Sequence, residues 1–254
     1  MEIIALGTGT SQGIPLIGCN CNTCSSSDPR DKRLRSSIHV RSEKVNIQVD
    51  VGPDLRQQYL VNGLSQIDHV LFTHEHNDHV IGLDDLRAVN FLQRKTLPLY
   101  AEERVAGEII KRFHYAFTEN KYPGAPDVSM NIINQDSIFQ WEDIEVQAIR
   151  INHGHLPILG FRFNNVAYIT DASRIDDAEM HKLKDLEVLI INALREKPHH
   201  SHLTLEEALH YIERIGARQS YLTHISHAMG PTESWEHKLP ESVYPLQDNF
   251  VLKV

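Results

Sequence analysis

The stretch from His74 to His79, with the sequence HEHNDH, most constrains this chain, because four of its six residues can bind a metal ion. Residues 68–72 before it are a short apolar run that favours a β-strand, and residues 82–92 after it have the apolar spacing of a helix. The cluster is therefore predicted to lie on a loop at the end of a buried strand, where α/β proteins place their functional groups. In an extended loop His74, His76 and Asp78 would face one way and His79 the other, which favours two adjacent ions over one.

Length and charge bound the class of protein. The chain has 254 residues, of which 41% are hydrophobic, enough for a large core in one α/β domain spanning residues 1–254. Its formal net charge of −9 argues against a broad surface for nucleic acid or membranes. No apolar run reaches the roughly 18 residues of a membrane span, and the N-terminus lacks the pattern of a signal peptide. We therefore expect a cytoplasmic protein that binds no membrane and forms no stable nucleic-acid complex.

All three cysteines lie in one short segment, as Cys19, Cys21 and Cys24. An odd, tightly clustered set is a poor disulfide framework and a good metal knuckle, so residues 19–24 are predicted to bind metal, with three reduced thiols as the alternative. The glycine-rich residues 7–15 just before them predict tight turns. A phosphate-binding loop would need a helix to follow at once, and a proline and the cysteine segment follow instead.

Ligand-type residues also follow three later strand patterns. His153 follows the alternating residues 144–151, and Asp171 follows a hairpin predicted over 158–170. His224 follows a strand predicted over 219–223. Together with the first cluster, seven candidate ligands therefore stand at the ends of four strands, and we expect them to converge on one edge of a sheet sandwich.

Two further segments bear on the site. Thr204 and Glu207 predict the capping box of a helix that stops at Gly216, and three histidines, His199, His200 and His202, stand just before it. Residues 116–134 are the least regular stretch. They fit a plain surface connection and a loop that covers a pocket equally well.

The complete pattern resembles the metallo-β-lactamase superfamily over nearly the whole chain. The resemblance implies an α/β (α+β) fold, a four-layer αββα sandwich with two divalent ions, Zn or Mn, at one edge. It implies three groups of ligands: His74, His76 and His153 for the first ion, Asp78, His79 and His224 for the second, and Asp171 as the bridge between them.

Within the superfamily, the cysteine segment and the pair His224 and His227 look most like PhnP-type phosphodiesterases. The resemblance implies a separate structural zinc held by Cys19, Cys21, Cys24 and His227, and such a set makes a closed tetrahedral site. His202 resembles the general acid of that family, with His199 and His200 as competitors for the role. The residues after it, Leu203 and Thr204, depart from the family form.

The implied activity is hydrolysis of a small, cyclic phosphodiester, such as 5-phosphoribosyl 1,2-cyclic phosphate or a 2′,3′-cyclic nucleotide. Asp78, Asp171 and His202 would be catalytic, and an imidazole with an ordinary pKa of about 6.5 suits protonation of a poor leaving group. Relatives of this type also suggest a homodimer.

Three other functions remain as alternatives. A tRNA 3′-processing nuclease would share the ligands but needs a basic surface, which the net charge of −9 disfavours. A thioester hydrolase of the glyoxalase II type would need a helical domain after the last ligand, and only 30 residues follow His224. A non-catalytic metal-binding scaffold is the alternative outside enzymes.

Overall fold

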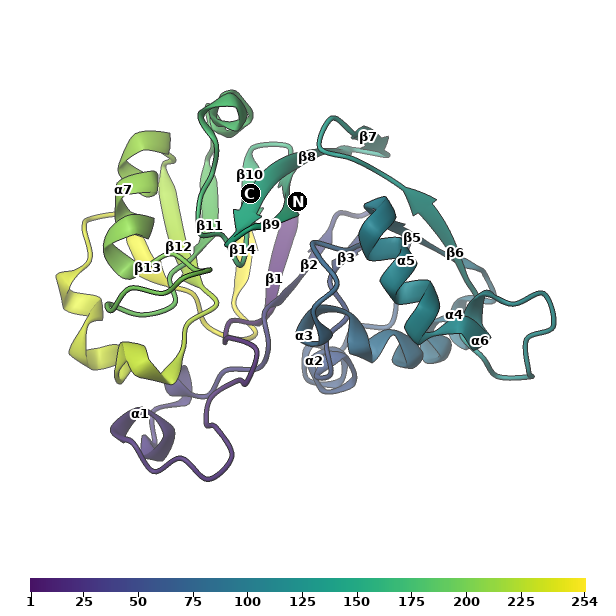
Figure 1. Ribbon diagram of the computed structural model, residues 1–254, viewed down its shortest axis with the longest axis horizontal. Helices are drawn as coiled ribbons and strands as arrows, with labels where there is room; N and C mark the ends of the chain where they lie inside the picture. Colours follow the sequence, from purple (N-terminus) through teal and green to yellow (C-terminus); the bar gives the residue numbers. More distant parts are fainter.

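The computed structural model describes residues 1–254, which form two seven-stranded mixed sheets packed against each other. The strand order is β14-β1-β2-β3-β4-β5-β6 in the first sheet and β13-β12-β11-β10-β9-β8-β7 in the second. Figure 1 shows α7 outside the second sheet and α2 to α6 on the side of the first. The predicted αββα sandwich is therefore confirmed.

The first sheet contains β1 (Glu2–Gly7), β2 (Ser37–Arg41), β3 (Asn46–Val49), β4 (His69–Leu71), β5 (Leu97–Ala101), β6 (Val128–Ile132) and β14 (Val251–Lys253). The second contains β7 (Ile138–Trp141), β8 (Ile144–His153), β9 (Leu156–Phe163), β10 (Val166–Ile169), β11 (Val188–Asn192), β12 (Gln219–Thr223) and β13 (Val243–Pro245). The helices are α1 (Asn22–Ser25), α2 (Leu55–Asn62), α3 (Asn77–Val80), α4 (Leu86–Gln93), α5 (Glu103–Arg112), α6 (His114–Phe117) and α7 (Leu205–Ile215). Short 3₁₀ turns lie at Pro29–Asp31, Ile81–Asp85, Asp177–Leu183, His227–Met229, Thr232–Ser234 and Glu236–Lys238.

Three apolar clusters hold the four layers together. One lies between the sheets and joins side chains such as Ile38 of β2 to Phe161 of β9. The second packs α2, α4 and α5 on the first sheet, and the third packs α7 on the second sheet. Because the central strands of both sheets are buried along their length, their polar side chains can reach solvent mainly where the strands end.

Several predicted elements are confirmed. The hairpin of β9 and β10 is antiparallel, and β12 spans the predicted residues 219–223. The capping box of α7 is complete, because Glu207 N donates to Thr204 Oγ1 at 3.2 Å and Thr204 N donates to Glu207 Oε2 at 2.8 Å. The helix then ends at Gly216, whose φ of 69° lies in the left-handed region.

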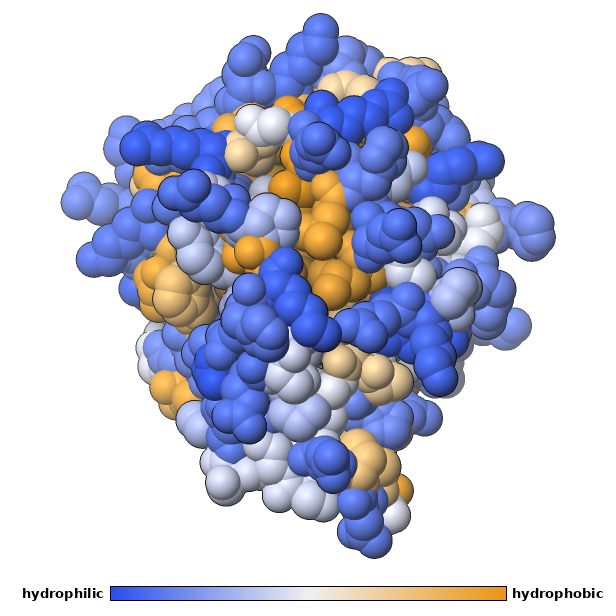
Figure 2. Space-filling view, turned by 90° about the vertical axis from the view of Figure 1, so that its left-hand side faces the viewer, coloured by the Kyte–Doolittle hydropathy of each residue, from blue (hydrophilic) through white to orange (hydrophobic).

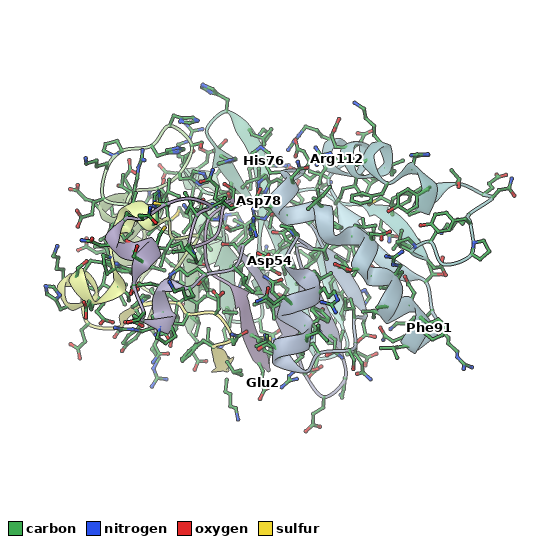
Figure 3. All side chains as sticks on the ribbon, turned by 90° about the horizontal axis from the view of Figure 1, so that it is seen from below. Glu2, Asp54, His76, Asp78, Phe91 and Arg112 are labelled. Atoms are coloured by element: carbon green, nitrogen blue, oxygen red, sulfur yellow. The ribbon has the colours of Figure 1, made fainter.

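The stretch at 116–134 contains a strand that the sequence did not predict. β6 pairs in parallel with β5 at the edge of the first sheet, and its mixed sequence VSMNI reflects this half-exposed position. The connection between α6 and β6 lies at one end of the long axis, whereas His76 and Asp78 lie near the middle (Figures 1 and 3). Of the two alternatives, the structure therefore favours a surface connection.

The surface on the side that carries α7 is mostly polar, and its apolar side chains form a central strip and several smaller, separate patches (Figure 2). A limited apolar strip of this kind is ordinary on a folded protein. None of the helices has both the length and the apolar character that crossing a bilayer requires.

Candidate metal centre

Three histidines from two different sheets meet at one edge of the sandwich. His74 Nε2 lies 3.0 Å from His76 Nδ1, and both follow β4 of the first sheet. The ring of His153, at the end of β8, lies 5.6 Å from that of His74 and 5.2 Å from that of His76. One ligand atom from each of the three lies within 4.8 Å of the others, so the group predicted for the first ion is assembled.

Asp171 lies at the centre of the remaining predicted ligands. Its Oδ2 is 3.4 Å from His79 Nε2, and its Oδ1 is 3.2 Å from His224 Nε2. Asp78 Oδ2 approaches the same His79 nitrogen at 3.2 Å. His74, His79 and Asp171 also form a group within 4.8 Å, so Asp171 lies between the two sets of ligands, as expected of a bridge.

Two unpartnered nitrogen atoms test whether these residues fit metal ions. His79 Nε2 and His224 Nε2 are buried and have no hydrogen-bond partner. A buried polar atom without a partner costs about 1–3 kcal/mol, so such atoms are rare unless something else binds them. Both atoms face the carboxylate of Asp171. A divalent ion beside that carboxylate would satisfy all three groups, and the residues therefore fit a two-ion centre.

The Nδ1 atoms of His79, His153 and His224 contact polar groups outside the centre. His79 Nδ1 donates to Asp50 Oδ2 at 2.7 Å, and His153 Nδ1 donates to the Ser201 carbonyl at 2.7 Å. His224 Nδ1 lies 3.2 Å from Ser36 Oγ. With Nδ1 engaged in this way, each ring presents Nε2 to the centre, which is how outer partners orient metal-binding histidines.

The charges at this edge are strongly coupled. Burial lowers the pKa of His79, but Asp78, Asp171 and Asp50 more than offset this effect and hold that pKa well above its ordinary value. Burial likewise raises the pKa of Asp171, yet His224, His79 and His74 hold it well below the usual range. Asp171 and Asp78 therefore stay charged, and cations bound beside them would balance that charge.

The backbone is strained where three of the site's polar residues leave their strands. Asp50, Asp171 and His224 have φ angles of 59°, 60° and 54°, in the left-handed region. Each such residue costs about 1–2 kcal/mol, and such strain tends to cluster at functional sites. At Asp50 the carbonyl is fixed by Gln48 Nε2 at 2.7 Å and Ser37 Oγ at 3.1 Å.

The first cluster does not lie wholly on an extended loop. His76 caps α3, so Asp78 and His79 stand on a helical turn, and the prediction that His79 points away from His74 was wrong. The turn is packed against residues 50–52, where Val51 N donates to the His79 carbonyl at 2.7 Å. A Cβ atom on Gly52 would clash with the Asp78 carbonyl, so this close approach requires glycine.

Asp50 is a site residue that the sequence reasoning did not identify. It is fully buried, and besides His79 it accepts hydrogen bonds from Thr73 N at 2.9 Å and Thr73 Oγ1 at 2.8 Å. The signal was present, because Asp50 directly follows the strand pattern at 45–49, as the other ligand-type residues follow theirs.

His202 is the one of the three competing histidines that lies against Asp171. Its Nδ1 is buried without a hydrogen-bond partner, 3.9 Å from Asp171 Oδ1. Its ring stacks on that of His224 at 4.9 Å, whereas His200 is exposed. Burial and the neighbouring His224 lower the pKa of His202 to about 3, so the ring is neutral before an anion binds.

Two open, polar pockets adjoin this edge. The larger, about 580 Å³, is lined by His76, His153, Gly154, His155, Leu156, His200 and Ser201. The other has no apolar lining and includes Arg174, His155, His199, His202 and Glu207. A more apolar groove between α2 and α4 shares none of these residues. The surroundings of the centre therefore suit a small, polar ligand.

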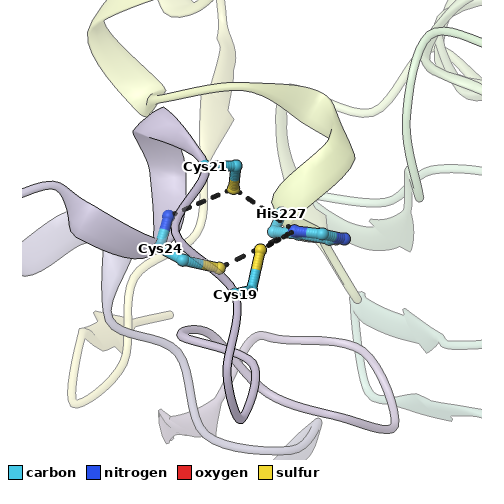
Figure 4. A group of neighbouring side chains, drawn as sticks. All are labelled: Cys19, Cys21, Cys24 and His227. Carbon is cyan, nitrogen blue, oxygen red and sulfur yellow. Dashed lines mark hydrogen bonds between the residues drawn. The ribbon is translucent and has the colours of Figure 1, made fainter.

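The cysteine segment and the loop after β12 form a second cluster (Figure 4). His227 Nδ1 lies 3.4 Å from the Sγ atoms of Cys19 and Cys21 and 3.7 Å from that of Cys24. Zinc bonds of about 2.3 Å to sulfur and 2.0 Å to nitrogen, at tetrahedral angles, separate the two atoms by roughly 3.5 Å. A hydrogen bond from Cys24 N also lowers the pKa of Cys21 to about 6, so one thiolate is already favoured at neutral pH. The four side chains therefore fit one zinc ion.

Comparison with known proteins agrees with the fold and the ligand pattern. A model of the β-lactamase superfamily domain matches residues 45–225. A solved diphosphatase of the PhnP family superposes with a TM-score of 0.92 at 37% identity, over 99% of this chain and 96% of that chain. The chain therefore belongs to the metallo-β-lactamase superfamily.

Two curated relatives have different names. An octanoyltransferase from Porphyromonas gingivalis is 44% identical over 229 residues, which are 89% of this chain and 46% of that protein. A ribonuclease Z from Pyrococcus furiosus is 28% identical over 190 residues, which are 73% of this chain and 53% of that protein. The chain spans about half the length of these relatives, so neither name settles its activity.

Replacement of Asp50 by asparagine should weaken binding of the ion assigned to Asp78, His79 and His224 by about 10–100-fold. An amide has one acceptor oxygen for the three hydrogen bonds that the carboxylate accepts, so His79 would lose its orientation. Chelator-competition titration measures the affinity. Asp143→Asn, at an exposed carboxylate, is the matched control. Equal affinities in the two variants would contradict the role of Asp50.

Replacement of Cys21 by alanine should remove one zinc per chain, because three ligands no longer close a tetrahedral site. Metal bound by the histidine and aspartate residues of the other centre should remain. Elemental analysis of protein purified without added metal measures both quantities, with Ser25→Ala as the control. A zinc content that is the same in both variants would rule out the cysteine site.

Proposed function

We propose that this chain is a metal-dependent phosphodiesterase that acts on small, cyclic phosphodiesters, such as 5-phosphoribosyl 1,2-cyclic phosphate or 2′,3′-cyclic nucleotides. The observation that carries the proposal is His202, an unpartnered imidazole 3.9 Å from Asp171, at the centre of the candidate ligands. A phosphodiester needs such a proton donor, because its alkoxide is a poor leaving group. Similarity to a PhnP-family diphosphatase supports chemistry at phosphorus.

The proposed ligands divide into two sets around one bridge. His74, His76 and His153 would hold one divalent ion, Asp78, His79 and His224 the other, with Asp171 shared between them. The chemistry that such ions supply when bound is activation of water near neutral pH and neutralisation of charge on phosphate oxygens. Nitrogen and carboxylate ligands suit both Zn and Mn.

His202 would hold and deliver the proton that the leaving oxygen takes. Burial lowers its pKa to about 3 in the ligand-free chain, and a phosphodiester anion beside the ring opposes that effect. Binding of substrate would therefore raise the pKa of His202 and favour uptake of a proton by the ring. Asp171 Oδ1 lies 3.9 Å from His202 Nδ1, and its negative charge also raises the pKa of the ring, in opposition to the larger effect of burial.

The polar lining of the pockets supports a small substrate. Arg174, His155 and His199 offer hydrogen bonds to phosphate or sugar oxygens, and the second pocket has no apolar wall for an acyl chain. Hydrolysis of a diphosphate is a second candidate, favoured by the description of the PhnP-family relative as a diphosphatase. The net charge of −9 disfavours tRNA as substrate.

The proposal is tested by assaying purified protein with Zn and Mn added separately. We expect hydrolysis of bis-p-nitrophenyl phosphate and of cyclic phosphodiesters, with little activity on thioesters or phosphate monoesters. Diphosphates in the same panel separate the two candidates. A chain that binds metal and hydrolyses no diester under either ion would overturn the proposed function.

Replacement of His202 by alanine should lower the rate on an alkyl diester by about 10²–10⁴-fold. The loss should be much smaller with an activated phenol as leaving group, because a phenolate leaves without a proton. His199→Ala and His200→Ala test the competing histidines, and His210→Ala, exposed on α7, is the control. Equal losses on both substrates would show that His202 does not act as the acid.

A further inference from the structure

We infer that Arg104 is a positioning residue for the three-histidine site, an inference that rests on the ligand set proposed above. Arg104 lies in the first turn of α5, and its guanidinium donates to two partners at once. Nη1 donates to Glu75 Oε1, and Nη2 donates to the Pro157 carbonyl at 2.7 Å. A planar guanidinium can hold two acceptors in fixed directions, so this contact fixes the two partners relative to each other.

Each partner of Arg104 lies on a segment that carries, or is paired with the strand that carries, a proposed ligand. Glu75 stands between His74 and His76 on the loop after β4 of the first sheet. Pro157 lies in the β8–β9 hairpin of the second sheet and is paired with Asn152, the residue that precedes His153. One guanidinium therefore links the segment that carries two ligands to the segment that carries the third.

The link matters because the three ligands come from different sheets. Their separation depends on how the two sheets meet at this edge, where Leu159 N of β9 donates to the Thr73 carbonyl at 3.1 Å. That hydrogen bond links the two segments at Thr73, and Arg104 adds a second link at Glu75, between His74 and His76. Metal affinity is sensitive to small changes in ligand spacing, so loss of either contact should weaken metal binding by the three histidines.

Glu75 depends on Arg104 for its charge balance. The Glu75 side chain is 14% exposed, and its second oxygen, Oε2, is buried without a hydrogen-bond partner. Arg112, at the other end of α5, donates to the Glu75 carbonyl and to Asn77 Oδ1, and Figure 3 shows it beside His76. Arg112 therefore holds the backbone of the loop, whereas Arg104 holds the carboxylate and connects it to the hairpin.

The attachment of α5 does not depend on Arg104. Its apolar face packs on the first sheet through Val105, Ala106 and Ile109. Glu102 at its N-terminus pairs with Arg150 of β8, where Arg150 Nη1 donates to Glu102 Oε2 at 2.8 Å and both side chains are less than 20% exposed. Removal of the Arg104 guanidinium should therefore disturb the ligands and leave the helix in place.

The test compares Arg104→Met, Arg104→Lys and the control Arg87→Met, whose exposed guanidinium pairs only with Asp84. The readouts are the affinities for two added Zn²⁺ or Mn²⁺ ions, by chelator competition, and the thermal midpoint of the metal-free protein. Arg104→Met should weaken the binding of one ion by about tenfold. The affinity for the other ion and the thermal midpoint should stay as in the control. The affinity of Arg104→Lys for that ion should lie between those of Arg104→Met and the control. An ammonium restores the positive charge next to Glu75 but cannot contact Glu75 and Pro157 together.

A second set of variants isolates the pair itself. Glu75→Gln should weaken the same ion, and the double variant with Arg104→Met should lose less than the two single losses combined. Additive losses, unchanged affinity in Arg104→Met, or equal weakening of both ions with a lowered midpoint would each overturn the inference. Because the titration uses metal alone, a wild-type chain that binds two ions but hydrolyses no diester would overturn the proposed function and leave this inference standing.

Discussion

The buried carboxylate of Asp171 is the constraint on which the candidate centre depends. Its side chain is almost fully enclosed, yet its two oxygens lie within 3.4 Å of His79 and His224. A buried charge is expensive unless opposite charge surrounds it. Asp171 follows β10, and the ends of β4, β8 and β12 bring imidazole rings to its carboxylate from both sheets. The sandwich thus places histidine side chains around this carboxylate, and cations bound between them would offset the cost of burying its charge.

Hydrogen bonds to the Nδ1 atoms of the candidate ligands keep their rings in place. Asp50, Ser36 and the Ser201 carbonyl each engage the back of one ring, and these partners come from widely separated parts of the chain. Left-handed backbone at Asp50, Asp171 and His224 turns each polar side chain sharply at the end of its strand. Such strain of about 1–2 kcal/mol per residue is tolerated because the three apolar clusters hold the strands. Rigidity at the edge therefore comes from the whole sandwich.

The sequence was sufficient for the fold and for the residues that gather at its edge. Apolar strands followed by His153, Asp171 and His224 made convergence predictable, because strands that run in the same direction, as β8, β10 and β12 do, end at the same edge of a sheet. Three features were not predicted. The helical turn at Asp78 depends on backbone packing against Gly52, and the partnership of Asp50 with His79 joins residues 29 positions apart. β6 was missed because an edge strand carries no clear apolar pattern.

One short loop after β12 carries both His227 of the cysteine cluster and His224 of the candidate metal centre. His224 and His227 are three residues apart, and Ile225 between them exchanges backbone hydrogen bonds with Thr8 and Thr10 of the glycine-rich segment. The cluster joins Cys19 to His227 across 208 positions, and Thr23 Oγ1 donates to the His227 carbonyl at 2.9 Å. Closing so long a loop restricts the unfolded chain, and it also anchors the segment that presents His224 to Asp171. A zinc ion bound by the cluster would therefore stabilise the position of a ligand at the other centre without taking part in its chemistry.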